Sequence, residues 1–438
     1  MPRTSKLATD VFTPRGALPN PEMYVPRPDL EADLKQALTI NTNVLVRGDS
    51  GCGKSWLYKK VLADLDAAYA IVNLAQARSF GSVGEAVIRT IAAGTDIVIG
   101  GRSGVQLGLG GFLQGVMGSA RETRRVLADP VLDAARILRR RAGKKRLAAI
   151  VFDNFEQIMD DAKLIRELSM IMMQIDTPDW AAYNVHNVVV GTPANIREFF
   201  AQVGSTPIQN RIREVPEVSR LTYEQAHELI IKGFVTNLGY PRTEAFPIVR
   251  EIGWMADRIP QHIHSLCLEV AFESDRCDGK LDSDVVAGAQ KRWLQAAESS
   301  SYVGIARQMQ NVTGAAARRR NQALYALSQM DRLDFSAADV ERQMRREFPV
   351  TTNVQNLGIG TILRFFAESK PPIIAPSAIA NGLYHFTNPI FRVCLRVMLV
   401  KDENENVTRL DSPDLTNLVS GTAPPVSEVA DAETNPTS

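Results

Sequence analysis

Four short apolar runs stand out in the first half of the chain, at Asn43–Arg47, Tyr69–Leu74, Leu147–Phe152 and Asn187–Thr192. Each is nearly continuous in apolar residues, and segments with helical spacing separate them. Strands that are buried on both faces have this pattern, because helices cover both sides of a parallel sheet. The first half of the chain therefore predicts an α/β fold on a parallel sheet, with Arg213–Leu221 as a candidate last strand.

From Thr222 the pattern becomes helical and continues to about Ser300. Thr222 and Gln225 have capping-box spacing, which marks the start of a helix. A third region of helices begins after Ala315 and ends in two short strands, at Ile373–Pro376 and Leu383–Thr387. We see no internal repeats.

Composition sets the expected domain boundaries. Residues 1–22 read as a loose N-terminal arm, and residues 402–438 read as a disordered tail because they are polar and poor in aromatics. A glycine-rich insert, either a loop or a hairpin, is expected at about 98–120. The remaining boundaries are 23–221 for the core, 222–300 for the helical region and 301–401 for the C-terminal domain.

Charge and cysteine content exclude several classes of protein. The 438 residues include 50 Lys and Arg against 49 Asp and Glu, so any nucleic-acid surface must be a local patch. The four cysteines form no C-x-x-C pair and imply no disulfide framework, and the five histidines do not cluster with cysteines. Because we find neither a signal-peptide core nor a convincing membrane span, we expect a cytoplasmic protein.

One octet carries the clearest chemistry, and its residues are Gly48, Asp49, Ser50, Gly51, Cys52, Gly53, Lys54 and Ser55. It matches the phosphate-binding loop pattern, it follows an apolar run, and Trp56 continues it with helical spacing. The glycines let consecutive backbone N–H groups face one anion, and the helix N-terminus adds positive potential. Lys54 is expected to reach the β- and γ-phosphates of ATP, and the Ser55 hydroxyl is expected to ligate Mg²⁺.

A second magnesium group is expected at the end of a neighbouring strand. Asp153 follows the apolar run Ala149–Phe152 and fits this position, known as Walker B. The next residue is Asn154, and an amide cannot accept a proton at neutral pH. Glu156 is therefore the candidate base for hydrolysis, although it reads equally well as an ordinary acid at a helix N-terminus.

Three further polar residues have two interpretations each. Thr192 follows the fourth strand and either senses the γ-phosphate or is a turn residue before Pro193. Arg211 and Arg213 lie at the start of the candidate last strand, where an arginine either reaches a neighbouring subunit's nucleotide or is simply solvated.

Taken in order, these segments resemble the AAA+/STAND group of P-loop ATPases, in particular the branch of origin-recognition initiators and archaeal-type ATPases. The resemblance spans about Met23 to Val400. It rests on Tyr24-Val25-x-Arg27, Gly48–Ser55, Asp153-Asn154, Val190-Gly191-Thr192 and Leu221–Ala226, followed by a helical lid.

The resemblance implies roles for residues outside the octet. Tyr24 and Arg27 lie where such ATPases place an adenine-contacting turn, and Pro260 matches a lid proline that packs near adenine. Arg258 stands where relatives have glycine, and Gln261 stands where many have the arginine that reads the nucleotide. Arg258 is the candidate substitute for that arginine.

The C-terminal region resembles a winged helix, with helices expected at Arg319–Met330, Ala337–Arg346 and Val354–Glu368. Duplex DNA is a candidate partner through Arg318, Arg319 and Arg320 and the nearby Arg342, Arg345 and Arg346. The presumed recognition helix offers only Gln355, Asn356 and Arg364 for base contacts, so a solvated helix face is an equal alternative.

The main functional prediction is an ATP-binding protein that acts as a nucleotide-dependent conformational switch with slow ATP hydrolysis. The alternative is a DNA-associated AAA+ ATPase in replication, transposition or defence that oligomerises on DNA. A small-molecule kinase leaves the C-terminal domain unexplained, and the chain has no N-K-x-D motif for guanine.

Overall fold

The computed structural model describes residues 6–16, 19–93, 97–99, 102–103, 129–192, 200, 206–296, 299–309, 315–354, 356–377 and 380–410. The chain divides into two compact units. The sheet unit consists of Asp10–Asn237 with Arg258–Gln261, and the helical unit consists of Met1–Thr9, Leu238–Asp257 and His262–Ser438.

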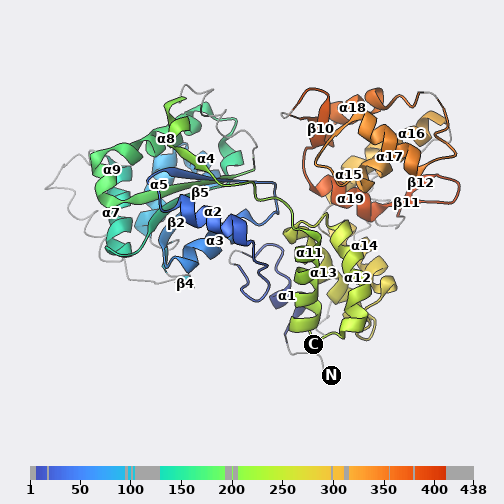
Figure 1. Ribbon diagram of the computed structural model, residues 1–438, viewed down its shortest axis with the longest axis horizontal. Helices are drawn as coiled ribbons and strands as arrows, with labels where there is room; N and C mark the ends of the chain where they lie inside the picture. Colours follow the sequence, from blue (N-terminus) through green and yellow to red (C-terminus); the bar gives the residue numbers. More distant parts are fainter. Residues whose placement is uncertain are drawn as a thin grey trace, which may run out of the picture. The chain divides into compact units, whose positions relative to one another are not determined.

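A seven-stranded sheet lies at the centre of the sheet unit, in the order β4-β3-β2-β5-β6-β1-β7 (Figure 1). The five strands from β2 to β7 pair in parallel, and β3 and β4 add an antiparallel edge. The strands are β1 Asn43–Arg47, β2 Ala68–Asn73, β3 Ile97–Ile99, β4 Arg102–Ser103, β5 Ala148–Asp153, β6 Val185–Gly191 and β7 Ile212–Glu214. The predicted α/β class with a parallel sheet is confirmed.

Helices cover both faces of this sheet. In β5 the residues Ala148, Ile150 and Phe152 belong to one core cluster, and the alternate residues Ala149 and Val151 belong to the other. This alternation is what a strand buried on both sides requires. The helices that do so are α2 Pro28–Ala37, α3 Lys54–Asp64, α4 Leu74–Phe80, α5 Val83–Ala93, α7 Pro130–Ala142, α8 Ala162–Met173 and α9 Pro178–Tyr183. The sheet unit also contains α11 Tyr223–Ile231. Residues of α2 and α3 fill one cluster, and residues of α4, α5, α7, α8 and α9 fill the other.

Local chemistry sets the element boundaries at three places. Thr222 and Gln225 form the predicted capping box at the start of α11. Leu74 does not extend the second strand as expected, because the Asn73 side chain accepts the N–H of Ala75 and caps α4. The last strand is much shorter than expected, since β7 ends at Glu214.

The described part of the N-terminal arm is not loose, which corrects the expectation for 1–22. α1 spans Ala8–Val11, and Val11 and Phe12 are both buried. The Phe12 ring packs on Phe234, with 5.0 Å between ring centroids, in the π-helical segment η4 Lys232–Asn237. Two adjacent apolar residues have no periodicity, so the sequence pattern gave no sign of this packing.

The helical unit contains two sets of elements (Figure 1). The first set is α12 Arg242–Met255, α13 Pro260–Arg276, whose first two residues belong to the sheet unit, α14 Ser283–Ala296 and α15 Ser299–Gln308. The second set is α16 Ala315–Gln329, β8 Asp334–Ser336, α17 Ala337–Glu347, α18 Ile359–Glu368, β9 Ile374–Pro376 and β10 Leu383–Phe386. Its strands form an antiparallel sheet in the order β8-β10-β9, which is the helix and strand arrangement expected of the predicted winged helix. Among the helices in the described ranges, none has both the length and the apolar character that a membrane crossing needs.

Two expectations for this unit are corrected. The helix expected from Val354 begins at Ile359, after Gly358 in a left-handed conformation, and Gln355 lies outside the described residues. Asp402 does not begin a tail, because β11 Leu399–Lys401 and β12 Val407–Arg409 form a hairpin after α19 Ile390–Met398. The Glu405 carboxylate fixes this hairpin by accepting the N–H groups of Val350 at 3.0 Å and Thr351 at 2.7 Å. Residues 411–438 and most of the glycine-rich insert lie outside the described residues.

A buried ionic cluster joins the two sets of helices within the helical unit. Asp257, just after α12, accepts hydrogen bonds from Arg392 at 3.0 Å and from Arg396 at 2.9 Å, and all three side chains are 3% exposed. Arg396 also donates to the Ser328 carbonyl at 2.7 Å. α12, from the region expected at 222–300, and α19, from the region expected at 301–401, belong to one compact unit, whereas α11 belongs to the sheet unit.

Candidate functional site

The phosphate-binding loop has the backbone that its glycines predict. Gly51 and Gly53 adopt φ values of +80° and +92°, and Gly53 is the N-cap from which α3 begins at Lys54. At Gly48 an added Cβ would lie 2.2 Å from the Val218 carbonyl oxygen, so no larger residue fits there. Within the octet Ser50 is exposed and Cys52 is buried, while Trp56 on the first turn of α3 is half-buried.

Lys54 folds back onto the loop. Its Nζ donates to the carbonyls of Gly48 at 2.7 Å and Asp49 at 2.9 Å. Burial lowers the pKa of Lys54, and the nearby charge of Glu156 opposes that shift. A cation held in this loop, with a carboxylate beside it, is positioned to exchange these carbonyls for phosphate oxygens.

Asp153 ends β5 and is surrounded by hydrogen-bond donors. Its Oδ2 accepts the Tyr58 hydroxyl at 2.9 Å and faces Ser55 Oγ at 3.4 Å. Its Oδ1 accepts the backbone N–H of Asn154 at 2.9 Å. The structure thus brings together the two predicted metal-binding residues from different elements.

This oxygen pair suits Mg²⁺ bound with a nucleotide. No cluster of three or more His, Cys, Asp or Glu that could hold a metal occurs among the described residues. A hydroxyl and one carboxylate are the donors that proteins supply to Mg²⁺ when phosphates and water complete its coordination. Ser55 and Asp153 fit that requirement and do not form a closed protein cage.

Glu156 also faces this site. It lies in the 3₁₀ turn η1 Phe155–Ile158, and its Oε2 accepts the backbone N–H of Thr192 at 3.2 Å, next to the end of β6. The four residues expected to act in catalysis, Lys54, Asp153, Glu156 and Thr192, therefore lie at the carboxyl ends of adjacent strands and the start of α3. It is the Thr192 backbone, not its hydroxyl, that makes the recorded contact.

Asn154 turns away from these residues. It adopts φ +64°, a left-handed conformation that Asn tolerates, and its Nδ2 donates to Asn73 Oδ1 at 3.1 Å. Its amide therefore links the ends of β5 and β2. In this arrangement the Asn154 amide is directed to Asn73.

The segment before β1 is fixed against the loop. Arg27 donates to the carbonyls of Cys52 and Ser219, both at 2.9 Å, and its backbone N–H donates to Glu31 at 2.8 Å. Glu31 also accepts the Tyr24 hydroxyl at 2.9 Å. Burial, reinforced by Glu31, raises the pKa of Tyr24, so this hydroxyl stays protonated.

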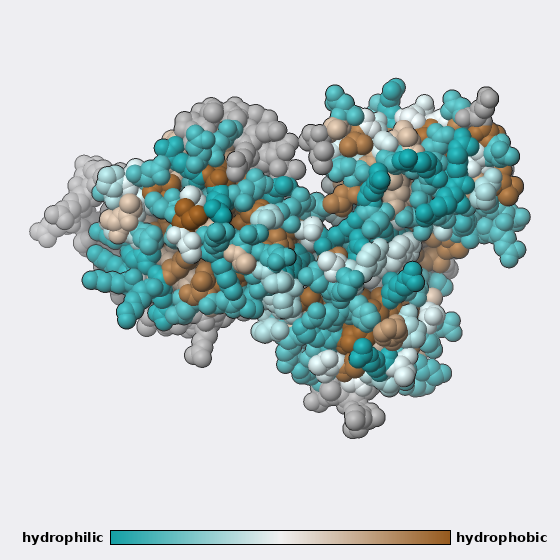
Figure 2. Space-filling model, in the orientation of Figure 1, coloured by the Kyte–Doolittle hydropathy of each residue, from teal (hydrophilic) through white to brown (hydrophobic). Residues whose placement is uncertain are grey.

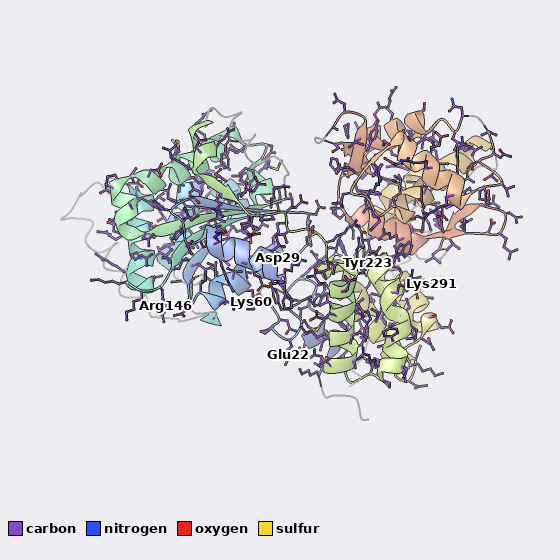
Figure 3. The ribbon with its side chains drawn as sticks, viewed as in Figure 1. Glu22, Asp29, Lys60, Arg146, Tyr223 and Lys291 are labelled. Atoms are coloured by element: carbon purple, nitrogen blue, oxygen red, sulfur yellow. The ribbon has the colours of Figure 1, made fainter. Side chains whose placement is uncertain are left out.

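Residues 258–261 also contact the loop. A Cβ on Gly53 would lie 3.9 Å from Pro260 Cγ, and the Gln261 N–H donates to the Gly51 carbonyl at 3.3 Å. Arg258 keeps the left-handed backbone of the glycine expected there, with φ +57°. Its guanidinium stacks 4.0 Å from the ring centroid of Tyr223 on α11, labelled in Figure 3. In this arrangement the Arg258 guanidinium is engaged with the ring, and its nucleotide-reading role stays a prediction.

Several arginines that the sequence suggests for contact with a nucleotide or with DNA have partners within the chain itself. Arg211 pairs with Asp176, and Arg213 donates to Gln36 at 3.2 Å. Arg320 stacks 3.9 Å from the Phe365 ring centroid on α18.

On α17, Arg342 pairs with Asp339, and Arg345 pairs with Glu341 at 2.7 Å. Figure 2 shows mainly hydrophilic residues over α17 on the visible face. The paired acids offset much of the expected positive patch. The Arg318 side chain lies outside the described residues.

Sequence reasoning missed Tyr58. It lies on the apolar stripe of α3 with Leu57, Val61 and Leu62, and so reads as a core residue. The available signal is that a buried tyrosine hydroxyl normally needs a partner. Tyr58 lies one helical turn after Ser55, so the partner of its hydroxyl is expected near the proposed metal site.

Comparisons with known proteins give structural likeness only. No family model and no curated protein matches the chain. A Walker-type ATPase of Pyrococcus abyssi is similar in structure, with 16% identity, coverage of 86% of this chain and 97% of that chain, and a TM-score of 0.49.

Two Aeropyrum pernix proteins are also similar. The ORC2 protein with ADPNP and ADP has 13% identity, coverage of 88% and 96%, and a TM-score of 0.48. The ORC1 protein in complex with DNA has 12% identity, coverage of 89% and 95%, and a TM-score of 0.43. These proteins are of the kind that the sequence resembles. Since all three TM-scores are below 0.5, the site assignment rests on the chain's own geometry.

Proposed function

We propose that this protein binds ATP with Mg²⁺ and acts as a nucleotide-dependent conformational switch with slow ATP hydrolysis. One observation carries the proposal: Lys54, Ser55 and Asp153 converge where a phosphate-binding loop opens α3. The loop's N–H groups and Lys54 bind the triphosphate, and Mg²⁺ held at Ser55 and Asp153 would neutralise charge on the transferring phosphate.

Glu156 is the group that we assign as the hydrolytic base. Its charge acts on Lys54 and its Oε2 accepts the Thr192 N–H, so we assign the water proton to its other oxygen, Oε1. Slow turnover follows from two features. The residue directly after Asp153 is an amide bound to Asn73, and the proposed base is itself engaged by the β6 end. We expect turnover below about 0.1 s⁻¹, roughly 100-fold below ordinary enzyme rates.

The switch operates through the segment Arg258–Gln261. This segment contacts the loop at Gly51 and Gly53, and it continues directly into α13. The preceding residue, Asp257, is bound by Arg392 and Arg396 of α19. A loop that rearranges around a γ-phosphate thereby displaces a segment covalently continuous with the helical unit. The cytoplasmic location stays a prediction.

The alternative function is a DNA-associated AAA+ ATPase in replication, transposition or defence, oligomerising on DNA. The observation that favours it is the α16–β10 arrangement, which has the winged-helix order, with Arg342 and Arg346 exposing 73% and 72% of their side chains on α17. Arg318, Arg319 and Arg320 remain the proposed phosphate contacts.

Nucleotide binding by Lys54→Ala tests the main proposal. We expect the affinity for ATP, measured with a fluorescent analogue, to fall at least about 100-fold, since a charge-assisted contact to the phosphates is lost. Lys60→Ala is the matched control, because Lys60 lies on the same helix and pairs with Asp64 at 2.5 Å. Equal affinity of wild type and Lys54→Ala would refute the nucleotide site.

Duplex binding at low and high salt tests the alternative. Alanine at Arg318, Arg319 and Arg320 should weaken binding to all sequences and reduce its salt dependence. The control variant has alanine at Arg140, Lys144 and Lys145, which are exposed residues of the sheet unit. It removes the same amount of positive charge away from the proposed DNA contacts. If wild type binds no duplex at low salt, with or without ATP, the alternative is wrong.

A further inference from the structure

Tyr58 touches the proposed magnesium site from inside the core. The side chain is 1% exposed, and its hydroxyl donates to Asp153 Oδ2 at 2.9 Å. Because Oδ1 accepts the Asn154 N–H, groups of the chain itself fix both oxygens of this carboxylate. Ser55, one turn earlier on α3, faces the same Oδ2 at 3.4 Å.

Packing alone does not account for this tyrosine. A phenylalanine would fill the same core volume, whereas the hydroxyl is useful only where it has a partner. A tyrosine hydroxyl has an ordinary pKa of about 10 and is therefore protonated near neutral pH. It donates a hydrogen bond that a carboxylate can accept.

We propose that Tyr58 is a positioning residue: its O–H fixes the orientation of the Asp153 carboxylate and so raises the affinity of the nucleotide-bound site for Mg²⁺. This inference rests on the proposed function. Ligating carboxylates are commonly oriented by hydrogen bonds from residues that do not touch the metal, and loss of such a partner typically lowers metal affinity 10- to 100-fold. Tyr58 acts through Asp153 and contacts neither nucleotide nor metal.

The test separates metal affinity from nucleotide affinity. Binding of N-methylanthraniloyl-ATP is measured first in EDTA and then across a Mg²⁺ titration. For Tyr58→Phe we expect an unchanged affinity in EDTA, within about twofold, and a half-saturating Mg²⁺ concentration about 10-fold higher than wild type. Tyr69→Phe is the matched control, because Tyr69 belongs to the same core cluster and none of the hydrogen bonds recorded for the described residues joins it to Asp153.

A double variant shows whether Tyr58 acts through the carboxylate. In an Asp153→Asn background, Tyr58→Phe should have no further effect on the Mg²⁺ requirement. Tyr58→Met provides a second apolar replacement if the phenylalanine variant does not fold.

Three outcomes overturn the proposal. They are an unchanged Mg²⁺ requirement in Tyr58→Phe, an equal loss of affinity in EDTA and in Mg²⁺, and an additive effect in the Asp153→Asn background. If wild type binds no nucleotide in either condition, the proposed function itself fails, and this inference fails with it.

Discussion

Replacement of Glu156 by glutamine removes the proposed base and retains its shape. The amide oxygen can still accept the Thr192 N–H that Glu156 accepts at 3.2 Å, so the turn η1 should keep its place. The amide cannot accept a proton from water, and general-base assistance is worth about 10²–10⁴-fold, or roughly 3–5 kcal/mol of activation free energy. We therefore expect phosphate release at saturating ATP to fall at least about 100-fold.

Binding should respond differently from turnover. The charge of Glu156 raises the pKa of Lys54 against the effect of burial, and its removal leaves that lysine's charge for the triphosphate. ATP affinity in Glu156→Gln should therefore equal or exceed that of wild type. Gln157→Ala is the control, since Gln157 is exposed on the same turn. Brisk wild-type turnover that survives Glu156→Gln would refute both the assigned base and the slow switch.

Three further predictions follow from individual contacts. Asn154→Glu should not accelerate ATP turnover, because this side chain faces Asn73 and its φ of +64° disfavours Glu; a rate increase would show that position 154 faces the water. Asp257→Asn should lower the free energy of unfolding of the helical unit by about 3–5 kcal/mol in calorimetry, since two buried arginines lose their counter-charge, and an unchanged transition would contradict this. Burial lowers the pKa of both His262 and His264 to about 4. Both stay neutral when folded but protonate when unfolded, so stability is intact above about pH 6.5 and falls toward pH 4, by on the order of 3 kcal/mol for each histidine; imidazole resonances of these residues that titrate near pH 6.5 in the folded protein would contradict it.

The parallel sheet and the loop could be predicted because each depends on local pattern. Doubly buried strands read as apolar runs, and the octet from Gly48 to Ser55 needs its glycines for backbone reasons. The capping box at Thr222 is equally local. Asp153 could be predicted because it directly follows the apolar run Ala149–Phe152, and Glu156 because it is the acid next along the chain after Asn154.

The contacts that were missed join residues far apart in the chain. Tyr58 reaches Asp153 across 95 positions, and the direction of the Asn154 side chain depends on Asn73 at the end of a neighbouring strand. The hairpin after α19 lies in a polar stretch that composition assigns to a tail, yet Glu405 anchors it on backbone N–H groups 54 and 55 positions away. Such anchors leave no periodic signal.

Hydrogen exchange of wild type in the apo, ADP–Mg²⁺ and ATP–Mg²⁺ states tests the central claim most directly. Both nucleotides should protect the loop Gly48–Ser55, because both occupy it. The switch predicts that ATP–Mg²⁺, measured before it is hydrolysed, changes exchange in Arg258–Gln261 and in α13, which continues from that segment. ADP–Mg²⁺ should not produce this change. Identical exchange of these segments with ATP and ADP, at full occupancy of the loop, would contradict a nucleotide-dependent switch.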